Sequence, residues 1–169
     1  MDAAECARRE GRRVAADEPS VLELLIEHEL AVKRLYEAFA LDFGDRRDLW
    51  QSLARDEQGH ADRLERLRPR STEVGRLWLD SGLRPQAIKS SIAYVESQRV
   101  RAEEGGLRLL QALAIAKDLE NALIEKEFSK LSGPTNVEIR SVLDDLAAET
   151  EKHRRVLAEA LEAESRSRL

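Results

Sequence analysis

The residues of this sequence best suited to chemistry are glutamates and histidines that interrupt apolar helical stripes. The clearest stripe lies in residues 50–67, where steps of three and four residues connect Trp50, Leu53, Glu57, His60, Leu64 and Leu67. Glu57 and His60 occupy central positions at which a heptad would carry leucine. Because side chains three residues apart share one helix face, these two can bind one metal ion together. The stretch therefore predicts a Glu-x-x-His metal site, with an exposed Glu–His pair as the alternative.

Three other stretches carry polar residues at a similar depth. Glu29 and Glu120 each lie at the centre of an apolar face, and Thr150 and His153 interrupt the last apolar stripe. An isolated buried carboxylate is costly, and neighbouring carboxylates repel each other. A multivalent cation among them would remove both costs. Carboxylates with imidazoles suit iron and manganese, and zinc less specifically. The sequence therefore predicts a buried metal site whose ligands come from separate helices.

Each of these residues also has an interpretation without metal. His153 fits a satisfied core histidine, and Glu120 fits an ion pair with a neighbouring cation. Tyr36 fits core packing as well as redox chemistry. His28 points about 100° away from its neighbour Glu29 on a helix, so we interpret it as structural or exposed.

The elements that position these residues are predicted to be long helices. Ala, Leu, Glu and Arg dominate the sequence, charged residues make up 36% of it, and there are only 8 Gly and 4 Pro among 169 residues. Apolar periodicity predicts helices over 20–43, 45–67, 85–104, 107–131 and 135–164. We expect residues 68–84 to be irregular because proline, glycine and serine are frequent there.

Local signals mark the ends of these helices. They are the capping boxes Ser20 with Glu23 and Thr135 with Glu138, the cap Asp45, the first-turn proline Pro85, and the break at Gly105 and Gly106. Short connections join the first two and the last two long helices, and a long one joins the pairs. This pattern predicts an all-α, up-down four-helix bundle over 19–164 whose long crossover contains an extra helix. Residues 1–18 are predicted to form a disordered tail, and 165–169 a second tail.

Charge and cysteine content limit the function classes. The net charge is −5 and acidic and basic residues are mixed, so no basic face for nucleic acid is expected. The single cysteine, Cys6, excludes an internal disulfide framework and a Cys-rich metal site. The charged N-terminus does not fit a signal peptide, and no apolar run approaches the ~20 residues that span a bilayer. We therefore expect a cytoplasmic protein without a membrane partner.

An internal repeat links the two halves of the chain. The segment from Leu53 to Leu64 matches the segment from Leu146 to Leu157, which aligns His60 with His153. Glu29 aligns with Glu120 at nearly the same spacing. Two similar helical hairpins related by a pseudo-twofold axis would direct these polar groups toward a common centre.

The sequence resembles the rubrerythrin and bacterioferritin branch of the ferritin-like superfamily over roughly residues 20–163. The resemblance rests on Glu29 with Tyr36, the Glu57-x-x-His60 pair, Glu120 and His153. It implies a site for two metal ions, usually iron, held by four glutamates and two histidines. One ion would bind Glu29 and His60, the other Glu120 and His153, with Glu57 bridging them. Tyr36 matches a tyrosine often found close to the metals, and a homodimer is implied.

Two features depart from the family pattern. Thr150 stands where a second bridging glutamate is expected, and a hydroxyl is a poor replacement for a bridging carboxylate. Glu149, four residues before His153, is the candidate that would swing inward instead. Failing that, the second ion binds weakly or the site holds one ion. The rubredoxin-like Cys-x-x-Cys module is also missing, so the redox partner is unknown.

The resemblance implies a non-haem di-iron oxidoreductase acting on peroxide, O₂ or Fe(II), in the manner of a rubrerythrin-like peroxidase or ferroxidase. The sequence leaves two alternatives open. One is a protein of the same fold that binds or stores iron or manganese without turnover. The other is a bundle that has lost its metal, with Thr150 as the mark of that loss.

Overall fold

The protein is all-helical throughout the residues that the computed structural model describes, which are 18–82, 84–122 and 136–167. Six α-helices are present there: α2 (Val21–Asp42), α3 (Arg47–Glu65), α4 (Ser71–Asp80), α5 (Pro85–Glu103), α6 (Leu109–Glu120) and α8 (Val137–Arg166). Two short 3₁₀ helices, η1 (Gly44–Arg46) and η2 (Arg68–Arg70), lead into α3 and α4. The predicted tail at 1–18 lies, apart from Glu18, outside the described residues.

The predicted start of the first helix is confirmed. Ser20 is the N-cap of α2, and its side chain accepts a hydrogen bond from the Glu23 amide at 3.2 Å. The Glu23 carboxylate in turn accepts a hydrogen bond from the Ser20 amide at 2.8 Å. This reciprocal capping box satisfies two amides that the first turn would otherwise leave without partners. Pro85 likewise lies in the first turn of α5, as its fixed φ favours.

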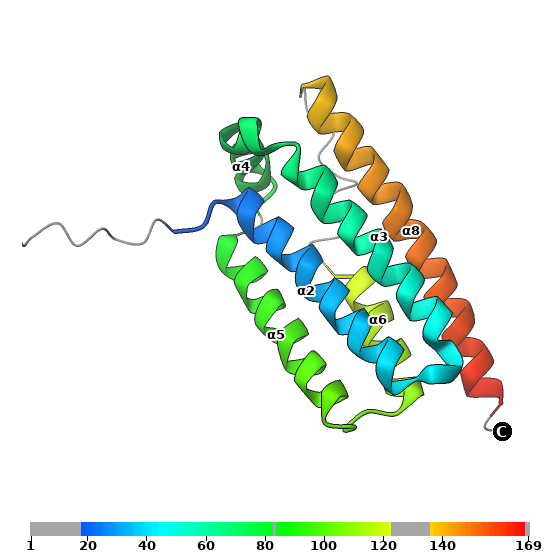
Figure 1. Ribbon diagram of the computed structural model, residues 1–169. Coiled ribbons are helices and arrows are strands. Elements are labelled where there is room, and N and C mark those ends of the chain that lie inside the picture. Colours follow the sequence, from blue (N-terminus) through cyan, green and yellow to red (C-terminus); the bar gives the residue numbers. More distant parts are fainter. Residues whose placement is uncertain (1–17, 83, 123–135, 168–169) are drawn as a thin grey trace, which may run out of the picture.

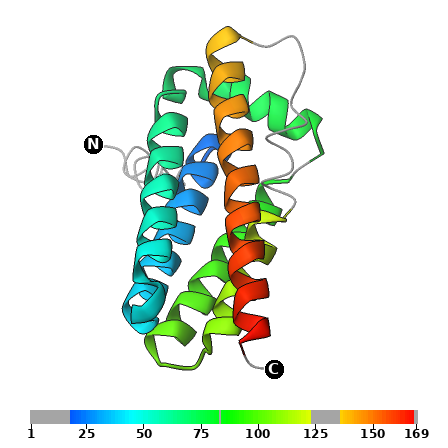
Figure 2. The same cartoon turned by 90° about the vertical axis from the view of Figure 1, so that its right-hand side faces the viewer.

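The long helices pair along their lengths. α2 packs on α3, α6 packs on α8, and α3 also contacts α8 (Figure 1). Within each of the first two pairs the helices run antiparallel, as the colours along the chain show (Figure 1). A view turned by 90° shows α3 and α8 side by side (Figure 2). α5 lies against α2 and contributes buried side chains, among them Ile88 and Val95, to the core.

The apolar core is divided into two parts by a polar layer. One part contains residues 31–40 of α2, 50–54 of α3, 112–119 of α6, and Leu157 of α8. The other contains the buried apolar residues of α2 between 21 and 25, Leu64 of α3 and Leu67 just beyond it, those of α8 between 139 and 146, and the buried side chains of α4. On α2, α3 and α8 the residues between the two parts include Glu29, Glu57, His60 and His153. The sequence positions that interrupt the apolar stripes therefore lie at one level of the fold.

The prediction that residues 68–84 are irregular is wrong. They contain η2 and the ten-residue helix α4, which packs against α2. Val74 and Trp78, four residues apart, are completely buried, and they supply the apolar face that holds this helix in place. Pro69 lies at the start of η2 and Gly82, with φ of 89°, follows α4. Pro69 and Gly82 thus lie near the ends of helices, whereas Gly75 lies within α4.

Several predicted helix boundaries also need correction. Asp45 is not a cap, because it lies inside η1 and the N-cap position of α3 is Arg46, which makes no side-chain capping bond. α6 begins at Leu109 and ends at Glu120, where the sequence predicted helix from 107 through 131. Residues 123–135, including Thr135 of the second predicted capping box, lie outside the described residues. Asn136 caps α8 by accepting a hydrogen bond from the Glu138 amide, and α8 continues to Arg166.

None of the helices in the described ranges is both long enough and apolar enough to cross a membrane.

Candidate metal centre

Five polar side chains meet in the layer between the two apolar parts of the core. Glu29, Glu57 and His60 form one group, and Glu57, Glu120 and His153 form a second group. In each group the possible ligand atoms lie within 4.8 Å of one another. All five residues are between 1% and 4% exposed. Glu57 belongs to both groups, so the two groups form one continuous cluster.

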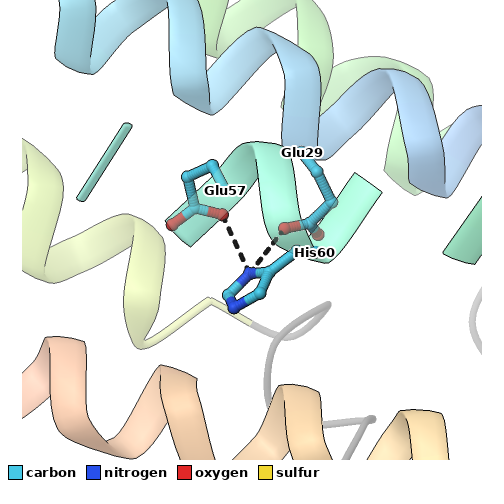
Figure 3. A group of neighbouring side chains, drawn as sticks. All are labelled: Glu29, Glu57 and His60. Atoms are coloured by element: carbon cyan, nitrogen blue, oxygen red, sulfur yellow. Dashed lines mark hydrogen bonds and ion pairs between the residues drawn. The ribbon is translucent and has the colours of Figure 1, made fainter. Parts of the chain in front are cut away.

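The inner nitrogen of each histidine faces carboxylates. His60 Nδ1 lies 3.2 Å from Glu29 Oε2 and 3.1 Å from Glu57 Oε2 (Figure 3). Figure 3 shows Glu57 and His60 projecting from α3 and Glu29 reaching toward them from α2.

The second histidine repeats this arrangement. His153 Nδ1 lies 3.3 Å from Glu57 Oε1 and 3.4 Å from Glu120 Oε1. The two imidazole rings stack, with centroids 5.5 Å apart and planes inclined by 26°. Each oxygen of Glu57 therefore faces a different histidine, which is the geometry of a bridging group.

The outer nitrogen of each histidine contacts a carboxylate from the opposite helix. His60 Nε2, on α3, lies 2.9 Å from Glu149 Oε2 on α8. His153 Nε2, on α8, lies 3.3 Å from Asp56 Oδ2 on α3. Metal-binding histidines commonly donate their second N–H to a carboxylate, which fixes the tautomer and the ring orientation. These crosswise contacts fix the ring orientations so that both Nδ1 atoms face the cluster.

Glu149 lies on the outer side of His60 and belongs to neither of the two groups. Its two oxygens accept hydrogen bonds from both terminal nitrogens of Arg63, at 2.7 and 2.8 Å. This paired contact joins α3 to α8 over the half-buried edge of the site. The inward swing that the sequence suggested for Glu149 would have to break both of these charge-assisted bonds.

Thr150 is buried at 1% exposed, one turn before His153 on α8. The position where the family pattern has a second bridging glutamate is therefore interior and neutral.

Tyr36 is in contact with the cluster. Its hydroxyl donates a hydrogen bond to Glu120 Oε1 at 2.9 Å, and its ring is completely buried. It also packs on Trp50, with ring centroids 5.8 Å apart. Both interpretations of Tyr36, core packing and a place beside the reacting groups, are thus compatible with its location.

His28 is buried at 1% exposed, so the alternative that it is exposed is wrong. Its Nε2 lies 2.9 Å from Ser91 Oγ on α5, and its Nδ1 lies 3.7 Å from Glu29 Oε1. As expected from its position on the helix, the His28 ring points away from the cluster, toward Ser91 of α5. His28 nevertheless lies beside Glu29 and helps to lower the pKa of that carboxyl.

Sequence reasoning missed Asp56 as part of the site. Its signal was available in the internal repeat, because Asp56 precedes Glu57 as Glu149 precedes Thr150. What the repeat could not show is that each of these carboxylates reaches the histidine of the other helix.

Burial and charge shift the pKa values within the cluster in opposite directions. Burial lowers the pKa of a histidine, but the surrounding carboxylates more than offset it and raise the pKa of His60 to about 12 and that of His153 to about 10. Burial raises the pKa of Glu57 above its usual range. Burial acts on Glu29 in the same sense, but the imidazoles of His28 and His60 hold its pKa well below its usual range. Without metal, both histidines are therefore protonated at neutral pH.

We expect the metal-free protein to lose stability as the pH rises above about 6.5. A raised histidine pKa contributes stability that is complete below the unfolded value of ~6.5 and is lost as the pH approaches the folded values. The raised pKa of Glu57 acts in the same direction, whereas the lowered pKa of Glu29 removes stability below about pH 4.5. Urea unfolding with a chelator, followed by helical circular dichroism, should show a fall on the order of 1 kcal/mol per pH unit above neutrality.

His153→Gln is the matched variant for this pH profile. It keeps a polar side chain of similar size but cannot carry the proton, so its stability should depend less steeply on pH. A wild-type stability that is constant or rises between about pH 6.5 and pH 9 would contradict the protonated-histidine cluster.

The atoms of the cluster fit a metal ion. Glu29 Oε1 and His153 Nδ1 are buried yet make no hydrogen bond within the described part of the chain. Buried polar atoms of native proteins are rarely left so. Three carboxylates and two imidazoles with inward Nδ1 atoms form the mixed oxygen and nitrogen donor set that transition metals accept. Buried Glu and His groups that could hold a metal ion are therefore present.

Comparison with known proteins adds no relative. No protein-family model matches the chain, and neither the curated proteins nor the solved structures include a significant match.

Proposed function

We propose that this protein is a ferritin-like carboxylate metalloprotein that holds two transition-metal ions, iron in the first place, and acts as an oxidoreductase on peroxide, O₂ or Fe(II). The main support for the proposal is the position of Glu57 between the two histidines. Its two oxygens face two histidines, and each histidine also faces a second carboxylate from another helix. A pair of ions sharing one bridging carboxylate would use every one of these atoms.

The helix arrangement supports a ferritin-like bundle. α2 with α3 and α6 with α8 form two helical hairpins, and the long segment that joins them contains α4 and α5. The first hairpin supplies Glu29, Glu57 and His60, and the second supplies Glu120 and His153. In di-iron carboxylate bundles one helix of each pair supplies a glutamate and the other a Glu-x-x-His motif. The first hairpin matches this pattern fully, and the second matches it except that Thr150 replaces the motif's glutamate.

The donor set favours iron or manganese. Calcium and magnesium prefer oxygen ligands throughout, so two imidazoles beside three carboxylates disfavour both. Structural zinc sites commonly use thiolates, and the only cysteine, Cys6, lies far from these residues in the sequence. Zinc with histidine and carboxylate ligands is the nearest competitor.

The residues of the chain have distinct roles in this proposal. Bound iron would supply the electrons that reduce peroxide or O₂. Glu57 would hold the two binding positions at a fixed separation, and Asp56 and Glu149 would keep His153 and His60 in the tautomer that leaves Nδ1 able to bind. Tyr36 holds a proton on its hydroxyl at 2.9 Å from Glu120, within reach of the reacting groups.

The burial of the cluster limits the size of the substrate. The five possible ligands are at most 4% exposed, and apolar residues lie on both sides of their layer. A surface groove of about 460 Å³ between α2 and α3 is lined by other residues, among them Lys33, Arg47 and Arg55. Peroxide, O₂ and Fe(II) are small enough to pass between helices, whereas an organic substrate of ordinary size would need a wider opening.

The test is metal binding by the purified chain, stripped with a chelator and titrated with Fe(II) without oxygen. We expect two equivalents of iron. At a free iron concentration about 100 times the dissociation constant, each bound ion should stabilise the protein by ~2.7 kcal/mol, or about 5–10 °C in melting temperature. Addition of hydrogen peroxide should then oxidise the bound Fe(II) faster than it oxidises Fe(II) in buffer.

The other outcomes separate the alternatives. Bound metal without accelerated oxidation would favour a binding or storage protein. A chain that neither binds Fe(II), Mn(II) or Zn(II) nor gains thermal stability from them would refute the proposal and leave a bundle that has lost its metal.

Three further parts of the proposal rest on the family resemblance. The protein would form a homodimer, lie in the cytoplasm and receive electrons from a separate donor. Sedimentation of the loaded protein would test the first of these directly.

A further inference from the structure

We infer that Arg154 is a positioning residue for Glu120, and that the second half of the metal centre depends on it whereas the first half does not. This inference rests on the proposed function. It starts from the observation that the candidate ligand Glu120 is the last residue of its helix, while the other ligands lie within long helices.

The C-terminal carbonyls of α6 are satisfied by groups outside the regular helix. Asn121 donates from its amide to the Lys117 carbonyl at 3.1 Å and from its side chain at 2.7 Å. The Leu119 carbonyl accepts from the Ala122 amide at 2.9 Å. The Glu120 carbonyl accepts from Arg154 Nε at 2.8 Å, across the interface with α8. The last carbonyls of a helix lack regular partners further along it, and a side chain such as that of Arg154 is one way to satisfy them.

Two consecutive residues of α8 therefore hold Glu120. His153 faces its carboxylate at 3.4 Å, and Arg154 binds its backbone carbonyl. Tyr36 adds a contact to the carboxylate from α2. The positive guanidinium also lies at the negative end of the α6 dipole, which strengthens the contact. Because helix ends fray readily, the position of the Glu120 side chain depends on this backbone contact.

The first half of the centre has no matching arrangement. Glu29 lies in the interior of the 22-residue helix α2, where the backbone is held by the regular ladder. In the internal repeat Arg154 aligns with Ala61, which is buried at 2% exposed and carries no donor in its side chain. A guanidinium bound to the backbone of a candidate ligand is thus found only in the group of Glu57, Glu120 and His153 among the described residues, whereas Arg63 contacts the first group only through Glu149.

Arg154→Met tests this dependence because it keeps an unbranched side chain of similar length up to the Nε position and removes the donor. We expect the anaerobic Fe(II) titration to change from two tight equivalents to one tight and one weak, with the weaker ion bound about 10–100-fold less tightly. Arg154→Lys should restore part of the affinity, since a lysine near a helix end can also donate to its last carbonyls. Arg155→Met, at the exposed neighbouring position, is the control and should bind two ions as the wild type does.

A second readout separates positioning from general destabilisation. The melting temperature of each variant without metal reports on the fold, and iron stoichiometry by equilibrium dialysis reports on the site. Arg154→Met that binds both ions with unchanged affinity, or that loses both ions equally, would overturn the inference while leaving the proposed function in place. A wild-type chain that binds no iron would overturn both. Loss of one ion restored by lysine would support the inference.

Discussion

Glu57→Gln should abolish the binding of both metal ions. Glu57 is the only residue shared by the two groups of possible ligands, and its removal leaves each group with one carboxylate and one histidine. Glutamine keeps the shape of the side chain but lacks the negative charge that a bridging position between two cations requires. The loss in affinity should exceed the ~10–100-fold that is typical of residues outside the first layer of ligands. Equilibrium dialysis with Fe(II) should find almost no bound iron.

The matched control for this variant is Glu65→Gln, an exposed glutamate near the end of the same helix. It removes the same charge from α3 and should leave two ions bound. Circular dichroism of both variants without metal verifies that the helices remain. Retention of one ion by Glu57→Gln would show that the two groups act separately, and retention of two would place the metal site elsewhere.

Thr150→Glu should have opposite effects on the metal-free and the iron-loaded protein. Thr150 is buried one turn before His153, at the repeat position that corresponds to Glu57. Without metal, a fourth carboxylate joins three that are already buried, and like charges in a low dielectric repel. We expect the melting temperature of the metal-free variant to fall by roughly 5–15 °C.

With iron bound, Thr150→Glu should raise the melting temperature instead of lowering it. Three carboxylates do not fully balance the four positive charges of two ferrous ions, and a fourth carboxylate would. The loaded variant should therefore melt above the loaded wild type and bind its second ion at least about tenfold more tightly, equivalent to ~1.4 kcal/mol. Differential scanning calorimetry with and without Fe(II) measures both effects on the same sample.

Thr150→Gln separates charge from size in this experiment. Glutamine is as large as glutamate but neutral, so any overpacking should lower the melting temperature of both forms. If Thr150→Glu destabilises the loaded protein as much as the metal-free protein, the side chain at this position does not reach the ions. The family pattern would then be the wrong guide to this part of the site.

The first and third predicted helices, over 20–43 and 85–104, illustrate what local sequence signals can show. Ser20 with Glu23 and the apolar stripe after them predicted the start of α2, and the proline at 85 predicted the start of α5. These signals are local, because capping bonds and side-chain faces depend on residues three or four positions apart. The same local rule placed Glu57 and His60 on one face of α3, and both are buried there.

Residues 68–84 show where local reading failed. The composition of this stretch is typical of a loop, yet Trp78 and Val74 hold a helix against α2. The free energy that stabilises α4 comes from burying these side chains against another part of the chain. Intrinsic propensity is too weak to reveal such a helix when tertiary burial decides it.

The helical period of the sequence shows which residues interrupt the apolar stripes, and so which carboxylates and histidines are buried at one level of the fold. Tertiary structure alone decided how they meet. In the folded chain Glu57 contacts both histidines, and Asp56 and Glu149 each contact the histidine of the opposite helix. Arg154 binds the backbone at the end of α6. The physical reason is that a helical period fixes the face on which a side chain lies, whereas its partners depend on how neighbouring helices are placed against that face.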